Sequence, residues 1–217
     1  MRTTALHATV IESQHADFPA ALRNERLTIP FSRLWALGRL GILDTPLAGL
    51  FCSTRCSGNV IVHTYDLARA LRDAEIPVIS GFHTPMEKEC LDVLLRGRQP
   101  VVICPARSIE RLRLPMAWRK PLAEERLLVL SPFGAPHRRP TTALAEQRNH
   151  LVATLAEVIC IAHAAAGSHT ERLVTALMAQ EKRTYTLHLA ENNHLMQYGV
   201  VGKAVHDLVD TLRTFPS

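Results

Sequence analysis

The chain has 217 residues, 47% of them hydrophobic and 21% charged, with a formal net charge of +5 at pH 7. This length suits one well-buried domain and is too short for two large ones. No window approaches the ~20 continuous apolar residues of a membrane-spanning helix, and the first residues lack the apolar core of a signal peptide. We therefore expect a cytoplasmic protein that does not enter a membrane.

The cysteines and arginines indicate which kinds of site the sequence can form. Five cysteines without a signal peptide favour reduced thiols over a disulfide framework, and Cys52 and Cys56 are the one close pair. No metal site is expected, because further ligands do not cluster around this pair. Arginines gather between residues 96 and 148. They form either a solvated surface or a site for an anionic partner, such as a nucleotide or nucleic acid.

The first third of the chain predicts an extension followed by a strand and a helix. Residues 1–47 form the expected N-terminal extension, with a short helix over Ser32–Leu43, where leucines cluster. Residues 48–217 form the main domain. Its first strand is expected over Ala48–Thr54, and a helix from about Val60 to Ala74 follows a polar turn.

The next unit carries the clearest pattern in the sequence. The apolar run Ile76–Ile79 ends in Ser80-Gly81, which is typical of a buried strand and a tight turn. Pro85 at the first helical position, with Glu87 in the first turn, indicates the start of a helix. The segment is therefore a strand, a turn and a crossover helix.

Similar units follow to the end of the chain, and strands that alternate with helices specify a parallel sheet. We predict a three-layer, doubly wound, mostly parallel α/β fold of the Rossmann-like type, in which Val78–Ile79 and Val101–Ile103 are neighbouring strands and the Ser80-Gly81 turn lies near the switch point. The further strands are expected over Pro100–Cys104, Arg126–Ser131, Glu157–His163 and Thr184–Leu189, and the further helices within Ile109–Lys120 (before a loop), from Thr141 or Thr142 to Ala156, from about Gly167 to Glu181, and over Val200–Leu212.

Small and polar residues follow the strands of this predicted sheet. The carboxyl ends of parallel strands meet at one edge, where helix N-termini favour a bound anion. His83 and His169 either bind phosphate, act as acid or base, or fill their turns, and Phe82 is a candidate for stacking on a base. The candidate phosphate-binding residues from these turns are Ser53, Thr54, Arg55, Ser57, Ser80, Gly81, Phe82, His83, Thr84, Arg107, Gly167, Ser168, His169 and Thr170.

The order of these turns resembles the DNA-processing protein A (Smf) family of Rossmann-like proteins. The counterparts of its motifs are Ser53-Thr54-Arg55, Ser80–Glu87, Arg148-Asn149 and Gly167–Thr170. The resemblance covers about residues 48–190 and implies binding of a nucleotide or single-stranded DNA by a homodimer. It adds Glu87, Arg148 and Asn149 to the site. Serine and proline in place of two glycines, and Glu87 in place of aspartate, mark a divergent, stand-alone member.

A related branch gives the alternative. The turn Gly167–Glu171 is similar to that of phosphoribohydrolases of the lysine decarboxylase-like type, which would make Arg148 and Glu171 catalytic residues of a nucleotide N-glycosidic hydrolase. A nucleotide-sensing module is a further possibility. No Ser-His-Asp order or paired carboxylates emerge, so no other catalytic residue is expected. A bound nucleotide is the one candidate cofactor.

Overall fold

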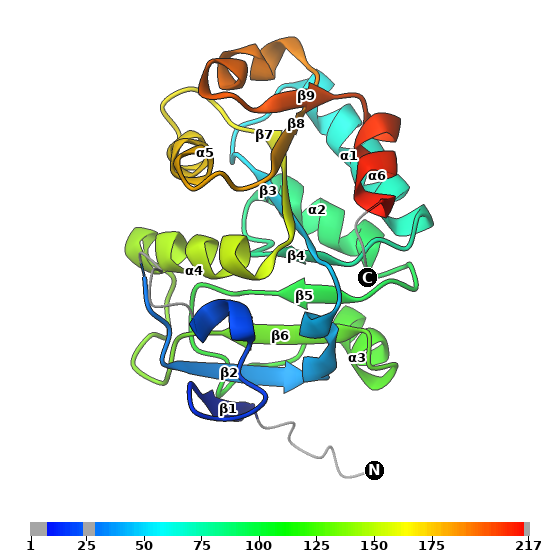
Figure 1. Ribbon diagram of the computed structural model, residues 1–217. Coiled ribbons are helices and arrows are strands. Elements are labelled where there is room, and N and C mark those ends of the chain that lie inside the picture. Colours follow the sequence, from blue (N-terminus) through cyan, green and yellow to red (C-terminus); the bar gives the residue numbers. More distant parts are fainter. Residues whose placement is uncertain (1–7, 24–28, 215–217) are drawn as a thin grey trace.

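The apolar runs of the sequence become the strands of one twisted sheet in the computed structural model, which describes residues 8–23 and 29–214 (Figure 1). The strands of this described part lie in the order β1-β2-β6-β5-β4-β3-β7-β8-β9. The strands β3 to β9 run parallel to one another, whereas β2 is antiparallel to both β6 and β1. Their bounds are β1 (Thr9–Glu12), β2 (Arg33–Gly38), β3 (Ala48–Cys52), β4 (Val78–Ser80), β5 (Val101–Ile103), β6 (Leu127–Ser131), β7 (Val158–His163), β8 (Thr184–Leu187) and β9 (Val201–Lys203).

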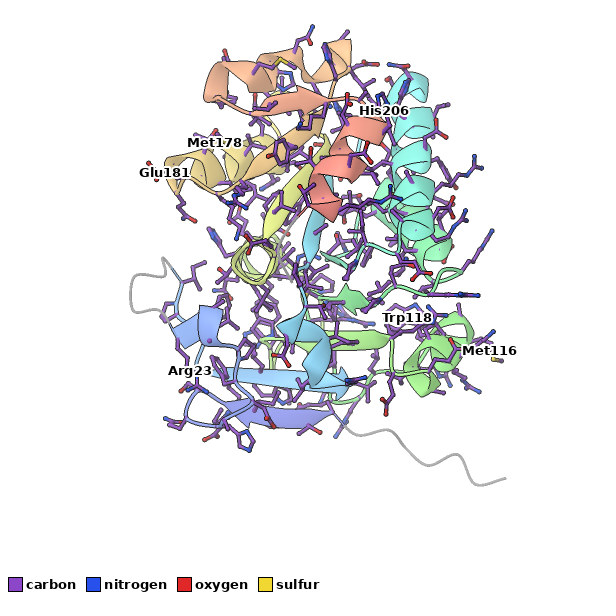
Figure 2. The ribbon with its side chains drawn as sticks, turned by 45° about the vertical axis from the view of Figure 1, so that its right-hand side comes forward. Arg23, Met116, Trp118, Met178, Glu181 and His206 are labelled. Atoms are coloured by element: carbon purple, nitrogen blue, oxygen red, sulfur yellow. The ribbon has the colours of Figure 1, made fainter. Side chains whose placement is uncertain are left out.

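Helices cover both faces of the sheet. One face packs against α1 (Gly58–Asp73), α2 (Pro85–Leu94), α3 (Met116–Ala123) and α6 (Val205–Arg213). The other face packs against α4 (Thr142–Leu155), α5 (His169–Ala179) and the 3-10 helices η1 (Ala20–Arg23), η2 (Leu40–Asp44) and η3 (Ala190–Tyr198). Side chains fill the spaces between these layers, and Met116 projects from the outer side of α3 (Figure 2). The architecture therefore has three layers.

The chain reverses its direction across the sheet beside β3. It passes from β3 through β4 and β5 to β6, and then crosses by α4 to β7, which pairs with the other side of β3. The switch point thus lies between β3 and β7, and the Ser80-Gly81 turn ends the adjacent strand β4. Val78 and Ile79 pair with Val101 and Val102. The predicted doubly wound α/β fold is confirmed.

The helix predicted over Ser32–Leu43 is wrong for its first half. The segment Arg33–Gly38 is strand β2, and a short 3-10 helix follows only at η2. Leucines in this segment fit either a helix or a strand, but Leu34 and Ala36 are buried in one core cluster and Leu37 in another. Pairing with β6 therefore decides the structure, so the segment before residue 48 contributes strands to the main sheet.

Two helices lie later in the chain than predicted. The last helix, expected over Val200–Leu212, begins at Val205, because Val201–Lys203 pairs with β8 as strand β9. The helix expected within Ile109–Lys120 lies instead at Met116–Ala123, after Pro115. Proline cannot donate a backbone hydrogen bond, so it is tolerated before the first turn of a helix.

Gly38 offers a direct test of the β2–β6 pairing. Its φ is +115°, and an added Cβ would lie 2.3 Å from the carbonyl oxygen of Leu127. We expect Gly38→Ala to lower the free energy of unfolding by about 1–3 kcal/mol, as measured by urea denaturation. The control is Gly58→Ala at the start of α1, where a Cβ meets no atom within 4 Å. In that variant the free energy of unfolding should rise by about 0.4–1 kcal/mol. Equal stability of the two variants would contradict this register.

Candidate functional site

A cleft of about 480 Å³ opens at the carboxyl edge of the sheet. It lies where β3 ends and where α2, α4 and α5 begin, next to the switch point. Open α/β sheets bind ligands at this position. The cleft is lined by Phe51, Cys52, Thr54, His83, Thr84, Glu87, Pro140, Thr141, Thr142, Ala145, Glu146, Arg148, Asn149, His169 and Thr170.

Arg148 is the buried cation of this cleft. It comes from α4, its side chain is 4% exposed, and its Nη1 donates to the carbonyl oxygen of Cys104 at 3.1 Å. Its guanidinium lies against Gly81, where an added Cβ would come within 1.1 Å of Nη1. Its Nε is buried and has no hydrogen-bond partner among the described residues. Burial lowers the pKa of Arg148, and the nearby Glu87 carboxylate opposes this effect. Arginine nevertheless keeps its charge at neutral pH.

The carboxylate of Glu87 accepts hydrogen bonds from the backbone and is therefore not free to contact a ligand. Its Oε1 accepts from the amide of Cys52 at 3.1 Å, and its Oε2 accepts from the amides of His83 and Thr84 at 2.8 and 3.2 Å. The hydroxyl of Thr84 in turn accepts from the amide of Glu87, which completes a capping box. The carboxylate therefore ties the end of β3 to the start of α2, and it occupies amides that could otherwise bind an anion.

The N-termini of α4 and α5 remain available to an anion. Thr141 and Ser168 cap these helices. The amides of His169 and Thr170 in the first turn of α5, and of Thr142 in the first turn of α4, have no hydrogen-bond partner among the described residues. Free first-turn amides and the helix dipole both favour negative charge.

Histidines stand on two sides of the cleft. The Nδ1 of His169 lies 3.0 Å from Oε1 of Glu146 and 2.6 Å from Nη2 of Arg172, so this nitrogen donates to one or accepts from the other. His169 therefore links α4 and α5 across the cleft. Partial burial lowers the pKa of His83, and the positive charges of Arg148 and Lys88 lower it further. His83 is thus mostly neutral at pH 7.

Three of the predicted site residues face the interior instead. Ser53 is buried, and its Oγ accepts from the amide of Ala165 at 2.9 Å, which joins the end of β3 to the loop after β7. Ser80 donates from its Oγ to the carbonyl oxygen of Leu50 at 2.6 Å. The ring of Phe82 is 5% exposed and packs in the core beneath α1 and α2. A ring in this position is not available to stack on a base.

The remaining predicted residues do not line the cleft. Gly167 and Ser168 form the turn that caps α5, Ser57 caps α1 and donates to Glu191, and Arg55 is exposed nearby. Arg107 belongs to a second hollow of about 510 Å³, formed by the loops after β5 and β6. This hollow is lined by Arg107, Ser108, Glu110, Arg111, Ala135 and Arg138.

Glu171 does not face Arg148 across the cleft. Its Oε2 accepts from the amide of Gly167 at 2.6 Å, and its Oε1 lies 3.3 Å from the hydroxyl of Tyr198 and 3.5 Å from Nε2 of His194. The carboxylate therefore stabilises the turn before α5 and the contact of α5 with η3. The pair Arg148 and Glu171, considered above as catalytic residues, is not brought together in this cleft.

Sequence reasoning missed the residues that the first turn of α4 contributes. Thr141 or Thr142 was predicted to begin a helix, but no local signal indicates that the start of this helix lies beside the end of β3. Within the described residues, no group of three or more His, Cys, Asp or Glu is arranged to hold a metal ion. No helix in this part of the chain is long and apolar enough to span a membrane.

The contact between Gly81 and Arg148 is testable by a double-mutant cycle. Gly81→Ala should lower the free energy of unfolding by about 1–3 kcal/mol, because the new methyl group displaces the guanidinium from Cys104. In an Arg148→Ala background the same change should cost much less. Gly41→Ala is the matched control, since its Cβ would meet no atom closer than 3.4 Å. Additive effects in the cycle would contradict the contact.

Comparisons with known proteins identify the family and agree with the fold. Residues 9–200 match the family of DNA recombination-mediator protein A. DNA processing protein A of Streptococcus pneumoniae has a similar structure, with a TM-score of 0.78 and 18% identity over 97% of this chain and 75% of that one. DNA processing protein A of Helicobacter pylori, whose structure concerns its mode of binding single-stranded DNA, is also similar. Its TM-score is 0.77, and its sequence identity is 21% over 96% of this chain and 97% of that one.

A more distant likeness shows how widely this fold occurs. The molybdenum cofactor carrier protein of Chlamydomonas reinhardtii has a TM-score of 0.54 and 13% identity over 79% of this chain and 100% of that one. Curated proteins yield no match to the sequence. Because the family match spans most of the chain and agrees with the fold, this chain belongs to the DNA recombination-mediator protein A family.

Proposed function

We propose that the cleft at the carboxyl edge binds the phosphate backbone of single-stranded DNA. The observation that carries this proposal is the buried guanidinium of Arg148, from the middle of α4, which lines a cleft together with first-turn residues of α4 and α5. A buried charge is costly unless it is paired, and Glu87, whose carboxylate favours the charged form of Arg148, makes no hydrogen bond with it among the described residues. Single-stranded DNA binding by the Helicobacter pylori family member supports the same ligand class.

A phosphate would find its strongest partners between α4 and α5. The free amides of Thr142, His169 and Thr170 supply donors, and Arg148 supplies the charge. Hydrogen bonds with a charged partner are roughly twice as strong as neutral ones. The amides at the start of α2 do not contribute, because Glu87 already holds them. The proposed contact set is therefore smaller than the full set of predicted turns.

The second hollow favours an extended strand over a single nucleotide. Pro140 lines the main cleft, and Arg138, two residues earlier in the same loop, lines the hollow that also holds Arg107 and Arg111. A strand that leaves the main cleft along this loop would place further phosphates beside these arginines. A mononucleotide would fill the main cleft alone. The buried position of Phe82 makes backbone contacts, rather than base stacking, the source of affinity.

We propose a binding role without catalysis. Glu171 is held by Gly167 and Tyr198, and Glu87 by three backbone amides, so neither carboxylate is free to act as a base beside Arg148. N-glycosidic hydrolysis needs such a group. The structure therefore favours the binding protein over the nucleotide hydrolase.

Arg148 should matter to DNA binding and a remote arginine should not. We expect Arg148→Gln to weaken binding of a labelled oligothymidylate by about 1.5–3 kcal/mol in fluorescence anisotropy, because a charge-assisted phosphate contact is lost. Arg96→Gln is the matched control, since Arg96 is exposed beyond the end of α2, at the opposite edge of the sheet. Both proteins are compared under conditions in which their circular dichroism spectra match the parent. Equal affinities would remove Arg148 from the site.

The salt dependence separates a DNA strand from a mononucleotide. Each phosphate neutralised on single-stranded DNA contributes about 0.7 to the slope of log affinity against log salt. The double variant Arg111→Gln/Arg138→Gln should therefore lower both oligothymidylate affinity and this slope, and leave thymidine monophosphate binding as in the parent. If the variant binds both ligands as the parent does, the second hollow takes no part.

We also propose that the chain forms a homodimer. In the described part of the chain no strand covers the outer side of β9, where Val201 is 53% exposed. An uncovered edge strand is a common site of association. Light scattering at micromolar concentration should give twice the chain mass of 24.1 kDa. Val201→Lys should shift the protein towards the monomer, whereas a parent protein that scatters as a monomer would contradict the proposal.

A further inference from the structure

Two thiols lie in contact at the wall of the cleft. Cys52 ends β3 and Cys56 precedes the cap of α1, and their sulfur atoms are 3.5 Å apart. Cys56 Sγ also lies 3.3 Å from the carbonyl oxygen of Ser53, to which its thiol donates. Formation of a disulfide would bring the sulfur atoms about 1.5 Å closer, to the usual bond length of ~2.05 Å.

The two thiols differ in a way that suits sequential oxidation. Cys56 is half-buried and reachable from solvent, whereas Cys52 is 1% exposed. A hydrogen bond from Cys52 lowers the pKa of Cys56, and the same contact together with burial raises the pKa of Cys52. The thiolate is the reactive form of cysteine. Cys56 is therefore the thiol that an oxidant meets first, and Cys52 is the buried partner beside it.

The remaining cysteines lack these properties. Cys90, Cys104 and Cys160 are all buried, and burial raises the pKa of each thiol to about 12. Inert buried thiols are usual in protein cores. The contrast singles out the pair in the turn between β3 and α1.

We propose that Cys52 and Cys56 form a redox modification site that hydroperoxides convert to a disulfide. The Cys56 thiolate attacks the outer oxygen of the peroxide, so that an S–O bond forms, the O–O bond breaks, and the leaving alkoxide or hydroxide takes up a proton. This step oxidises the sulfur by two electrons to a sulfenic acid. The sulfur of Cys52 then attacks that of Cys56. The S–S bond forms, the S–O bond breaks, and hydroxide leaves as water with the Cys52 proton.

The position of the pair connects this modification to the cleft. Cys52 lines the cleft, and its backbone amide donates to Glu87, which holds the start of α2. Thr54, between the two cysteines, lines the cleft as well. A disulfide would close the loop Cys52–Cys56 on itself at this wall. A small dithiol would reopen it by exchange.

The test is intact-mass measurement of the reduced protein after treatment with hydrogen peroxide. We expect the loss of two hydrogen atoms per chain, a peptide map that joins Cys52 to Cys56, and full reversal by dithiothreitol. Cys90→Ala is the control and should oxidise as the parent does. A Cys52→Ala variant should stop at a sulfenic acid on Cys56, which a 1,3-dicarbonyl reagent traps, and Cys56→Ala should form neither product.

Several results would overturn the proposal. These are an unchanged mass at a peroxide dose that oxidises free glutathione completely, a disulfide that joins other cysteines, or oxidation that stops in Cys90→Ala. The peptide map of the parent protein decides the matter by itself if either single variant folds poorly. Reduced and oxidised parent protein are compared by circular dichroism, so that a product of unfolded chains is recognised and counts against the site.

Discussion

The arrangement of the cleft depends on one buried carboxylate. Glu87 accepts hydrogen bonds from three backbone amides that belong to the end of β3 and the start of α2, and it lies near enough to Arg148 to influence its pKa. A buried charge requires such compensation. With Glu87 in place, strand, turn and helix hold one geometry, and the guanidinium has a defined position against Gly81. The Glu87 carboxylate thus organises the site from within, and the phosphate of the proposed ligand would contact the side of Arg148 that faces the cleft.

Much of the fold follows from local sequence patterns. Buried parallel strands contact apolar layers on both faces and read as continuous apolar runs, which is why Val78–Ser80 and Leu127–Ser131 were recognisable. The errors arose where the pattern was ambiguous. Arg33–Gly38 contains enough leucine for either a strand or a helix, and its pairing with β6 comes from a distant part of the chain. No local signal encodes such a partner.

The site was less predictable than the fold. Polarity after a strand indicates that a turn lies at the carboxyl edge, but it does not indicate which way each side chain points. Ser53 and Ser80 are polar because they hold neighbouring backbone in place, and Phe82 completes the core. The capping pattern of Thr84 and Glu87 was present in the sequence and would have suggested that this carboxylate serves the helix. The α4 residues that line the cleft could not be predicted without knowing the path of the crossover helix.

The crossover helix α4 also contributes to the cleft while it connects the two halves of the sheet. Gly81 follows β4, whereas Arg148 lies on α4, the helix that carries the chain from β6 to β7 on the other side of β3. A chain in which α4 has not docked would therefore lack the buried cation beside Gly81. Because a ligand that binds the native state alone stabilises that state by mass action, occupancy of the cleft would favour chains in which α4 is docked on the sheet. Binding in the cleft and docking of α4 would then be thermodynamically linked.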